Sequence, residues 1–156
     1  MAPPKVAEYV EALFKSSSNV KVKVLADQRQ IEKDYPLMAA VNRGANEVPA
    51  HQARLITLEY HNSETPGKDA PSFETLMMVG KGVTIDTGGL DVKIRGAMFG
   101  MSLDKYGAAM VAAFFMALDR LKPKGVKVVG HMAMVRNSVA ANAYSCDEII
   151  TVSGRE

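Results

Sequence analysis

Hydrophobic and polar positions along the chain switch between helical and strand spacing, and this predicts alternating helices and strands. After Pro3 and Pro4, which suit the first turn of a helix, apolar residues recur at helical spacing as far as Phe14. From Val20 to Leu25 apolar residues alternate with lysines. This alternation predicts a strand with one solvent-exposed face.

Two short helices and a second strand are predicted next. The Asp27 side chain can cap a helix that reaches Lys33, and residues 36–41 have the pattern of another helical turn. Residues 55–60 then predict a strand. Residues 61–72 are rich in Asn, Ser, Pro, Gly and Asp, and they predict a surface connection.

The second half of the chain repeats the alternation of strand and helix. Residues 76–79 are almost all apolar, as in a central parallel strand buried on both faces. Residues 105–121 give the strongest helix prediction, and residues 126–129 and 149–152 predict two further buried strands. The order of elements predicts an α/β fold, with a largely parallel twisted sheet flanked by helices on both faces.

Length and composition narrow the class of protein. The chain has 156 residues, a single-domain length, with 47% hydrophobic and 23% charged residues and a net charge of +2. This small charge argues against nucleic-acid or anionic-membrane partners, and no uninterrupted apolar run approaches the ~18 residues of a membrane span. The first residues lack the features of a signal peptide. The single cysteine, Cys146, favours a reducing compartment; it has no histidine near in sequence, so an idle thiol is a commoner interpretation than a nucleophile.

Charged residues gather just after the strand predicted at 76–79, where α/β proteins bind ligands. Asp86 offers two oxygens and can bridge a pair of divalent ions, and Asp104 can add a carboxylate from the start of the next helix. Lys81 can bind a metal only as a neutral amine, a form that a neighbouring dication favours. Lys93 can stay charged and stabilise an oxyanion, or it can transfer a proton.

Other interpretations of this cluster remain open at this point. Lysines at loop edges are usually solvated, and an aspartate before a helix is usually a cap. A phosphate-binding loop is disfavoured because Gly82, rather than Ser or Thr, follows Lys81. No His-Glu-x-x-His or paired Cys-x-x-Cys motif is present, and His51, His61 and His131 are isolated. His131 is expected to be a hydrogen-bonded core or edge residue.

The methionines divide into two groups. Met98 and Met101 lie in the glycine-bearing segment between Lys93 and Asp104, where flexible, polarisable side chains can line an apolar substrate pocket. Four further methionines are expected in the core: Met110, Met116, Met132 and Met134.

The run Val79-Gly-Lys-Gly-Val-Thr-Ile-Asp-Thr-Gly-Gly, followed by Lys93 and by Met101-Ser-Leu-Asp-Lys-Tyr-Gly-Ala-Ala, resembles the leucyl aminopeptidase family of dinuclear metallopeptidases, family M17. The similarity continues through Val126-Lys-Val-Val-Gly and Met134-Val-Arg-Asn-Ser, and it extends from about Pro3 to the last residue. The Arg-Asn-Ser form of the final motif is similar to the aminopeptidase-like branch found in animals.

The resemblance implies a role for each candidate residue. Lys81 would bind a metal through its neutral amine, Asp86 would bridge two metals, and Asp104 would bind the same metal as Lys81. Lys93 would be the catalytic lysine that polarises the scissile carbonyl and stabilises the tetrahedral oxyanion. Met101 would line the pocket for the first side chain of the substrate.

The resemblance also implies an activity, cofactors and partners. The expected activity is metal-dependent removal of N-terminal residues from peptides, with two divalent ions: zinc, with manganese or magnesium in the exchangeable site. Members of the family form hexamers and are mostly cytosolic, so a homo-oligomer in the cytoplasm is expected, without nucleic-acid or membrane partners.

The chain departs from the family pattern at both ends. The family's N-terminal macro-like domain is missing, and its Asn-Thr-Asp-Ala-Glu-Gly-Arg segment would fall just after residue 156. That segment supplies two further metal-binding carboxylates and an arginine that positions bicarbonate. Residues 1–156 are therefore expected to be the N-terminal half of a catalytic domain, inactive unless a C-terminal fragment complements them, with an exposed apolar sheet edge. A non-catalytic structural or assembly subunit derived from the same fold is the alternative.

Overall fold

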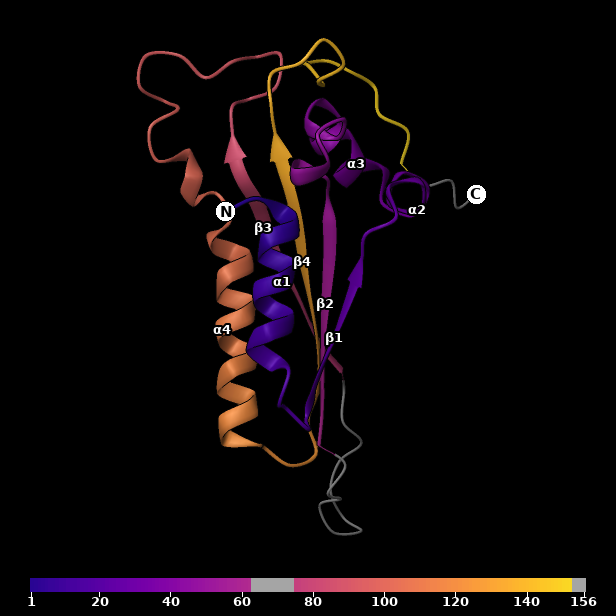
Figure 1. Cartoon of the computed structure of the whole chain (residues 1–156), viewed down its shortest axis with the longest axis vertical. Coiled ribbons are helices and arrows are strands. Elements are labelled where there is room, and N and C mark those ends of the chain that lie inside the picture. The colour runs from indigo at the N-terminus through magenta and orange to yellow at the C-terminus, as the bar shows by residue number, and fades with distance from the viewer. Residues whose placement is uncertain (63–74, 153–156) are drawn as a thin grey trace.

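A computed structural model describes residues 1–62 and 75–152 of the chain. In this part of the chain one mixed sheet of four strands has the order β1-β2-β4-β3. Helices cover both of its faces (Figure 1). The helices and strands are α1 (Pro3–Phe14), β1 (Val20–Leu25), α2 (Gln28–Asp34), α3 (Pro36–Asn42), β2 (Arg54–His61), β3 (Thr75–Asp86), α4 (Tyr106–Leu121) and β4 (Lys127–Asn137).

Strand pairing confirms the α/β class and shows that the sheet is mixed. β3 and β4 are parallel and are connected through α4, as the alternation of strand and helix predicted. β1 pairs antiparallel with β2, and β2 pairs antiparallel with β4. The antiparallel pairing of β1 and β2 arises because α2 and α3 follow the carboxyl end of β1 and return the chain to the same end of the sheet. The parallel arrangement was expected for most of the sheet, but among the described strands only the β3–β4 pair has it, and the other two pairs are antiparallel.

Local sequence signals in the first half of the chain are confirmed. α1 begins at Pro3, and β1 spans the predicted residues. The Asp27 side chain caps α2 by accepting a hydrogen bond from the backbone N–H of Gln30 at 2.9 Å. The surface connection predicted at residues 61–72 lies almost entirely outside the described residues.

Strands β3 and β4 are longer than the sequence predicted. β3 continues to Asp86, so the segment after Val79, expected to form a loop, remains in the strand. Its β-branched run of Val, Thr and Ile favours extended backbone. Glycine is needed at residue 82 of this strand, because a Cβ at this position would lie 2.6 Å from the sulfur of Met134.

The strand predicted at residues 149–152 is wrong. The structure assigns no strand to these described residues, and the Ile149 side chain is 96% exposed. Apolar character alone suggested a buried strand, but β1 and β3 end the described sheet, and neither pairs with this segment.

The main core lies between one face of the sheet and helices α1 and α4. Phe115 of α4 and Tyr60 of β2 are both fully buried there. Gly130 of β4 lets α4 approach, since a Cβ at this position would meet the Phe115 ring at 2.5 Å. Further members of this core are Val6, Val10, Phe14, Ile56, Leu58, Val111, Val128, Met132 and Met134.

A smaller core covers the opposite face. Ile31 of α2 packs with Val83 of β3 and Val135 of β4, with Met38 and Val41 of α3 beside them. These contacts place α3 over the carboxyl-terminal part of β4, beside its arrowhead in Figure 1, with α2 packed against α3 on the side of β1. The same end of the sheet carries the residues that the sequence singled out.

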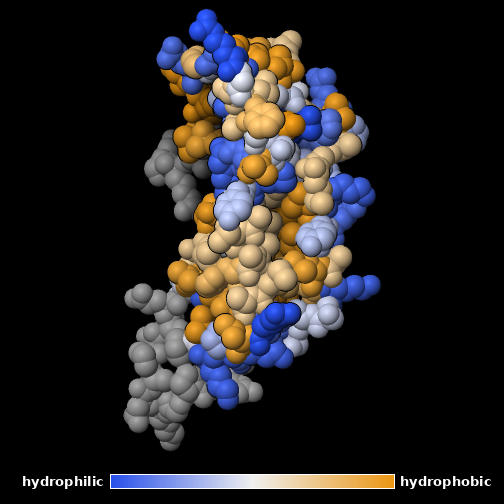
Figure 2. All heavy atoms as spheres, turned by 90° about the vertical axis from the view of Figure 1, so that its left-hand side faces the viewer, coloured by the Kyte–Doolittle hydropathy of each residue, from blue (hydrophilic) through white to orange (hydrophobic). Residues whose placement is uncertain are grey.

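β3 is an edge strand in the described sheet, which corrects the prediction that it is buried on both faces. Only β4 pairs with β3, and the side chains of Met77 and Val79 are left uncovered, with 62% and 76% exposure. On α4, Leu121 is 79% exposed, and Met110 and Met116, which were expected in the core, are also exposed. Figure 2 shows apolar side chains gathered along this side of the molecule. The exposed apolar edge that was expected is therefore present, and such surfaces usually pack against other protein.

The segment Met101–Leu121, which includes α4, is long and apolar enough to cross a membrane by length and composition alone. The core helix of a soluble protein passes the same test. One side of α4 is such a core surface, because Val111, Phe115 and Leu118 are buried against the sheet.

Replacing Gly80 with alanine is expected to destabilise the protein by about 1–3 kcal/mol, the usual cost of overpacking. An added Cβ would lie 2.6 Å from the carbonyl oxygen of Gly107 and 2.7 Å from the backbone of Ala108. Both obstacles are backbone atoms of α4, so they cannot rotate away. Urea unfolding of the variant measures the loss, and an unchanged midpoint would contradict this close contact between β3 and α4.

Candidate functional site

The candidate site lies at the carboxyl ends of the parallel strands β3 and β4. Asp86, the last residue of β3, is in register with Asn137, the last residue of β4. The segments that follow, 87–105 and 138–152, both leave the sheet at this end (Figure 1). Carboxyl ends of parallel strands are the usual position of ligand sites in α/β proteins.

The first charged pair connects β3 with the segment that precedes α4. The Lys81 Nζ lies 3.5 Å from Oδ2 of Asp104, and the two side chains are 62% and 23% exposed. The approach is close because Gly107 has no side chain, and a Cβ there would lie 2.9 Å from the backbone nitrogen of Lys81. The structure thus brings together two predicted site residues that are far apart in sequence.

The second charged pair joins Asp86 to Lys93. Lys93 Nζ lies 3.2 Å from Oδ2 of Asp86, and the side chains are 29% and 17% exposed, respectively. The segment between the two residues turns back toward Asp86. A hydrogen bond of 2.9 Å from the Lys93 N–H to the Thr87 carbonyl closes this turn. Gly88 occupies this turn with φ +95°, and a Cβ would approach the Asp91 carbonyl to 2.2 Å. Only glycine fits such a position.

The other oxygen of Asp86 is held by two further donors. Its Oδ1 accepts hydrogen bonds from Nδ2 of Asn137 at 2.6 Å and from the N–H of Gly88 at 3.0 Å. Burial raises the pKa of Asp86, but the hydrogen bonds from Asn137 and Gly88, together with the Lys93 ammonium, outweigh it and hold the pKa below its usual 3.8. The fold therefore favours the ionised carboxylate.

The lowered pKa of Asp86 has a consequence for stability. Since the folded pKa lies below the usual 3.8, the ionised carboxylate stabilises the fold above that pH, and this contribution is lost as the pH falls through the folded value. The free energy of unfolding of wild type should therefore exceed that of Asp86→Asn near neutral pH, and the difference should shrink below about pH 4. Urea titrations with a chelator present measure this, and a constant difference would contradict it.

Two hollows flank Asp86. One, of about 310 Å³, is lined by Lys81, Asp86, Asn137 and Tyr144 and by apolar residues of α3. The other, of about 430 Å³, is lined by Asp86, Lys93, Tyr144 and residues of the turn between them. Because Asp86 and Tyr144 line both hollows, a ligand in either one would lie next to the Asp86 carboxylate.

Met101 lies near the cluster but lines neither of these hollows. It begins a 3-10 turn, Met101–Leu103, directly before Asp104, and it is partly exposed. Its role in a substrate pocket stays a prediction.

Sequence reasoning missed two residues of this region, Asn137 and Tyr144. Asn137 is only 3% exposed, and its backbone carbonyl accepts hydrogen bonds from both the N–H and the hydroxyl of Thr87. The Tyr144 carbonyl accepts from the N–H of Leu90 at 3.2 Å. A polar residue after a predicted strand was the available signal for Asn137, but the strand was predicted to end at residue 129, too early to reveal it.

Cys146 and His131 have environments that argue against catalysis. Cys146 is exposed, with its sulfur 3.4 Å from Oδ2 of Asp91. The hydrogen bond to Asp91 and the charge of that carboxylate raise the pKa of the thiol, whereas an activated nucleophile needs a lowered one. His131 Nδ1 lies 3.1 Å from the Thr57 hydroxyl, so it is a hydrogen-bonded strand residue as predicted.

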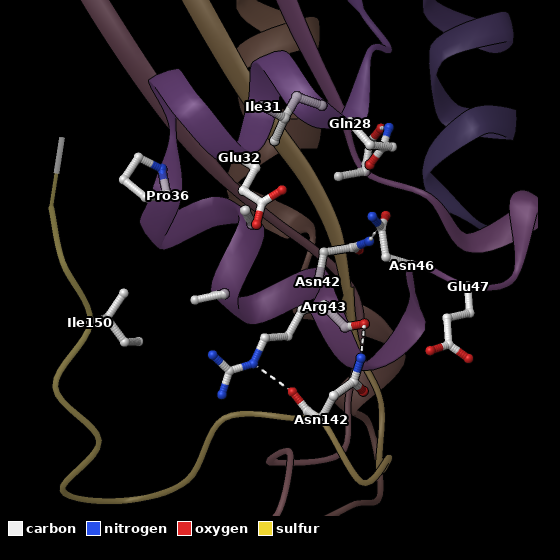
Figure 3. A pocket seen from close by; sticks show the side chains of 13 residues that line it. Gln28, Ile31, Glu32, Pro36, Asn42, Arg43, Asn46, Glu47, Asn142 and Ile150 are labelled. Atoms are coloured by element: carbon white, nitrogen blue, oxygen red, sulfur yellow. Dashed lines mark hydrogen bonds between the residues drawn. The ribbon is translucent and has the colours of Figure 1, made fainter.

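A third hollow, of about 400 Å³, lies between α2, α3 and the C-terminal segment (Figure 3). Arg43 connects the two sides, since its side chain donates to the Asn142 carbonyl and pairs with Glu148 at 2.6 Å. Buried Asn42 forms part of the lining. None of the charged residues at the end of β3 lines this hollow, so it is separate from the candidate site.

The donor set partly fits a divalent metal. Carboxylate oxygens of Asp86 and Asp104 and a neutral amine of Lys81 are suitable ligands for zinc or manganese. Within residues 1–62 and 75–152, however, no three His, Cys, Asp or Glu side chains form a group that could hold a metal. The residues present therefore suit a metal centre in type, with too few donors to complete one.

Sequence and structure comparisons relate this chain to known proteins. The profile of the cytosol aminopeptidase family, catalytic domain, matches residues 1–156. A candidate aminopeptidase of Caenorhabditis elegans is 58% identical over 151 residues, which cover 97% of this chain and 28% of that protein. Leucyl aminopeptidase from Trypanosoma brucei, solved with actinonin, has a TM-score of 0.82 at 26% identity, over 98% of this chain and 27% of that one.

A further structural relative contains a metal. The bottromycin maturation enzyme BotP in complex with Mn superposes with a TM-score of 0.77 at 30% identity, over 96% of this chain and 30% of that one. The chain thus spans under a third of the length of each of these relatives. The match over residues 1–156 and the close C. elegans relative show that the chain belongs to the cytosol aminopeptidase family.

Proposed function

We propose that this chain supplies part of the active site of a metal-dependent aminopeptidase, as the N-terminal half of its catalytic domain. The observation that carries the proposal is the meeting of two lysines and two aspartates at the end of β3, in the pairs Lys81–Asp104 at 3.5 Å and Lys93–Asp86 at 3.2 Å. Such pairs of cations and carboxylates match the chemistry of a site that binds metals and stabilises an oxyanion.

Each residue has a proposed role. Lys81, as a neutral amine, and Asp104 would hold one metal ion, and Asp86 would bridge to a second. Both Asp86 oxygens lie next to hydrogen-bond donors and a cation, which keep the carboxylate ionised as a ligand must be. Met101 would contact the first side chain of the substrate.

The metal ions, zinc with manganese or magnesium in the exchangeable site, would supply Lewis acidity and water activation when bound. Lys93 contributes a positive charge from the chain itself. Its ammonium would donate hydrogen bonds to the oxygen of the scissile carbonyl as negative charge develops there. The Lys93 side chain is more than two-thirds buried, so its charge would act with limited screening by water.

A non-catalytic structural or assembly subunit is the second candidate function. The small number of metal donors among the described residues favours it, together with the 62% exposure of Lys81. Under the first proposal, the remaining donors come from outside this chain.

The proposed substrates, cellular location and oligomeric state are based on the same family membership. The substrates would be peptides with a free N-terminus, and the protein would act in the cytoplasm as a homo-oligomer. The exposed apolar surface of β3 and α4 offers area for packing against the rest of the protein. The chain by itself is therefore expected to associate, and a monodisperse monomer in sedimentation would contradict this.

Calorimetric titration with zinc or manganese, followed by an assay of leucine-anilide hydrolysis, separates the two functions. The aminopeptidase proposal expects submicromolar binding of two ions and hydrolysis once the chain is combined with a C-terminal fragment that carries the remaining ligands. Absence of metal binding even in that combination would favour the structural subunit.

A further inference from the structure

Only one of the two polar atoms of the Asn137 side chain forms a hydrogen bond among the described residues. Its amide nitrogen donates to Oδ1 of Asp86 at 2.6 Å, whereas its own Oδ1 is buried with no hydrogen-bond partner among the described residues. Burial of an unpaired carbonyl oxygen is unfavourable, and most proteins avoid it. The Asn137 side chain therefore lies where its nitrogen bonds Asp86, although the unpaired buried oxygen lowers the stability of the fold.

The backbone of Asn137 fixes the same region. Asn137 and Asp86 are paired in the β3–β4 register, directly after an irregularity between Val83 and Asp86. The Asn137 carbonyl accepts two hydrogen bonds from Thr87, at 3.0 Å from its N–H and 2.9 Å from its hydroxyl. One residue thus holds both the carboxylate of Asp86 and the start of the turn that leads to Lys93.

We infer that Asn137 is a positioning residue that orients the Asp86 carboxylate, with Oδ1 held by the amide and Oδ2 directed to Lys93. The effect of this orientation on metal affinity rests on the proposed function, whereas the orientation itself is observable in the metal-free protein. Groups that hydrogen-bond to a metal ligand typically change metal affinity about 10–100-fold when they are removed.

The test uses the intact protein with two substitutions. Asn137→Ala removes the donor to Asp86 without adding a charge. Asn42→Ala is the matched control, since Asn42 is equally buried and its amide bonds Asn46 and the Arg136 N–H. Manganese affinity is measured by calorimetry, and the Asp86 side chain is observed in crystal structures of the metal-free proteins.

The inference expects manganese affinity to fall about 10-fold or more in Asn137→Ala and to remain unchanged in the Asn42 variant. It also expects Asp86 to leave its wild-type rotamer in metal-free Asn137→Ala. If wild type binds no manganese while Asp86 moves, the metal proposal fails and the positioning role stands. If wild type and Asn137→Ala bind manganese equally well, the positioning role is wrong and the metal proposal stands. An unmoved Asp86 in a protein that binds no manganese overturns both.

Discussion

The Asp86→Ala substitution in the intact protein is expected to abolish aminopeptidase activity and to weaken manganese binding more than about 100-fold. Loss of a group that merely supports a metal ligand costs about 10–100-fold, so loss of Asp86, the proposed bridging ligand, should cost more. Asp86 is also one of two residues, with Tyr144, that line both flanking hollows. No other described carboxylate lies at the end of β3 to replace it within this strand.

Calorimetry with manganese and a leucine-anilide assay measure these effects. Asp34→Ala is the control, because Asp34 is exposed at the end of α2 and lines none of the hollows next to Asp86. Retention of tight manganese binding by Asp86→Ala, with the fold intact by circular dichroism, would refute the role of Asp86 as a ligand.

Under the proposed function, Lys93→Met is expected to lower kcat about 10²–10³-fold without loss of manganese binding. This is the usual cost of losing one group that stabilises an oxyanion. Methionine keeps most of the length of the side chain but removes the charge beside Asp86. Since the Lys93 ammonium lies 3.2 Å from Oδ2 of Asp86, its loss also removes a cation that would compete with metal ions for that oxygen. Manganese affinity should therefore hold or rise while kcat falls.

Steady-state kinetics combined with metal titration separates these effects. Lys33→Met serves as the control, because Lys33 is exposed on α2. A parallel loss of metal affinity and activity in Lys93→Met would mean that the lysine holds the metal site together, and a normal kcat would remove it from catalysis.

The sequence predicted the elements whose signals are local. Periodicity located α1, and the Asp27 cap and the proline at residue 36 located the starts of α2 and α3. It underestimated the length of β3 and β4, because glycines at residues 80 and 82 look like loop residues. In the fold they are strand residues that admit α4 and Met134. Such close approaches are properties of packing, which local sequence does not reveal.

The residues of the candidate site were predictable, and their pairing only in part. Residue types and spacing singled out Lys81, Asp86, Lys93 and Asp104, and the family resemblance implied that Lys81 and Asp104 lie together, whereas the contact of Lys93 with Asp86 follows from the fold alone. The contribution of Asn137 depends on the register between β3 and β4, which no local pattern encodes. The strand predicted at residues 149–152 failed for a related reason, since apolar residues form a strand only where a neighbouring strand can pair with them.

Anomalous diffraction from manganese-soaked crystals of the intact protein tests most directly whether the end of β3 is half of a dinuclear metal centre. The expected result is two manganese peaks, one in contact with Lys81 and Asp104 and both in contact with Asp86. Peaks elsewhere on the protein, or none at saturating manganese, would contradict the assignment of this cluster as a metal centre.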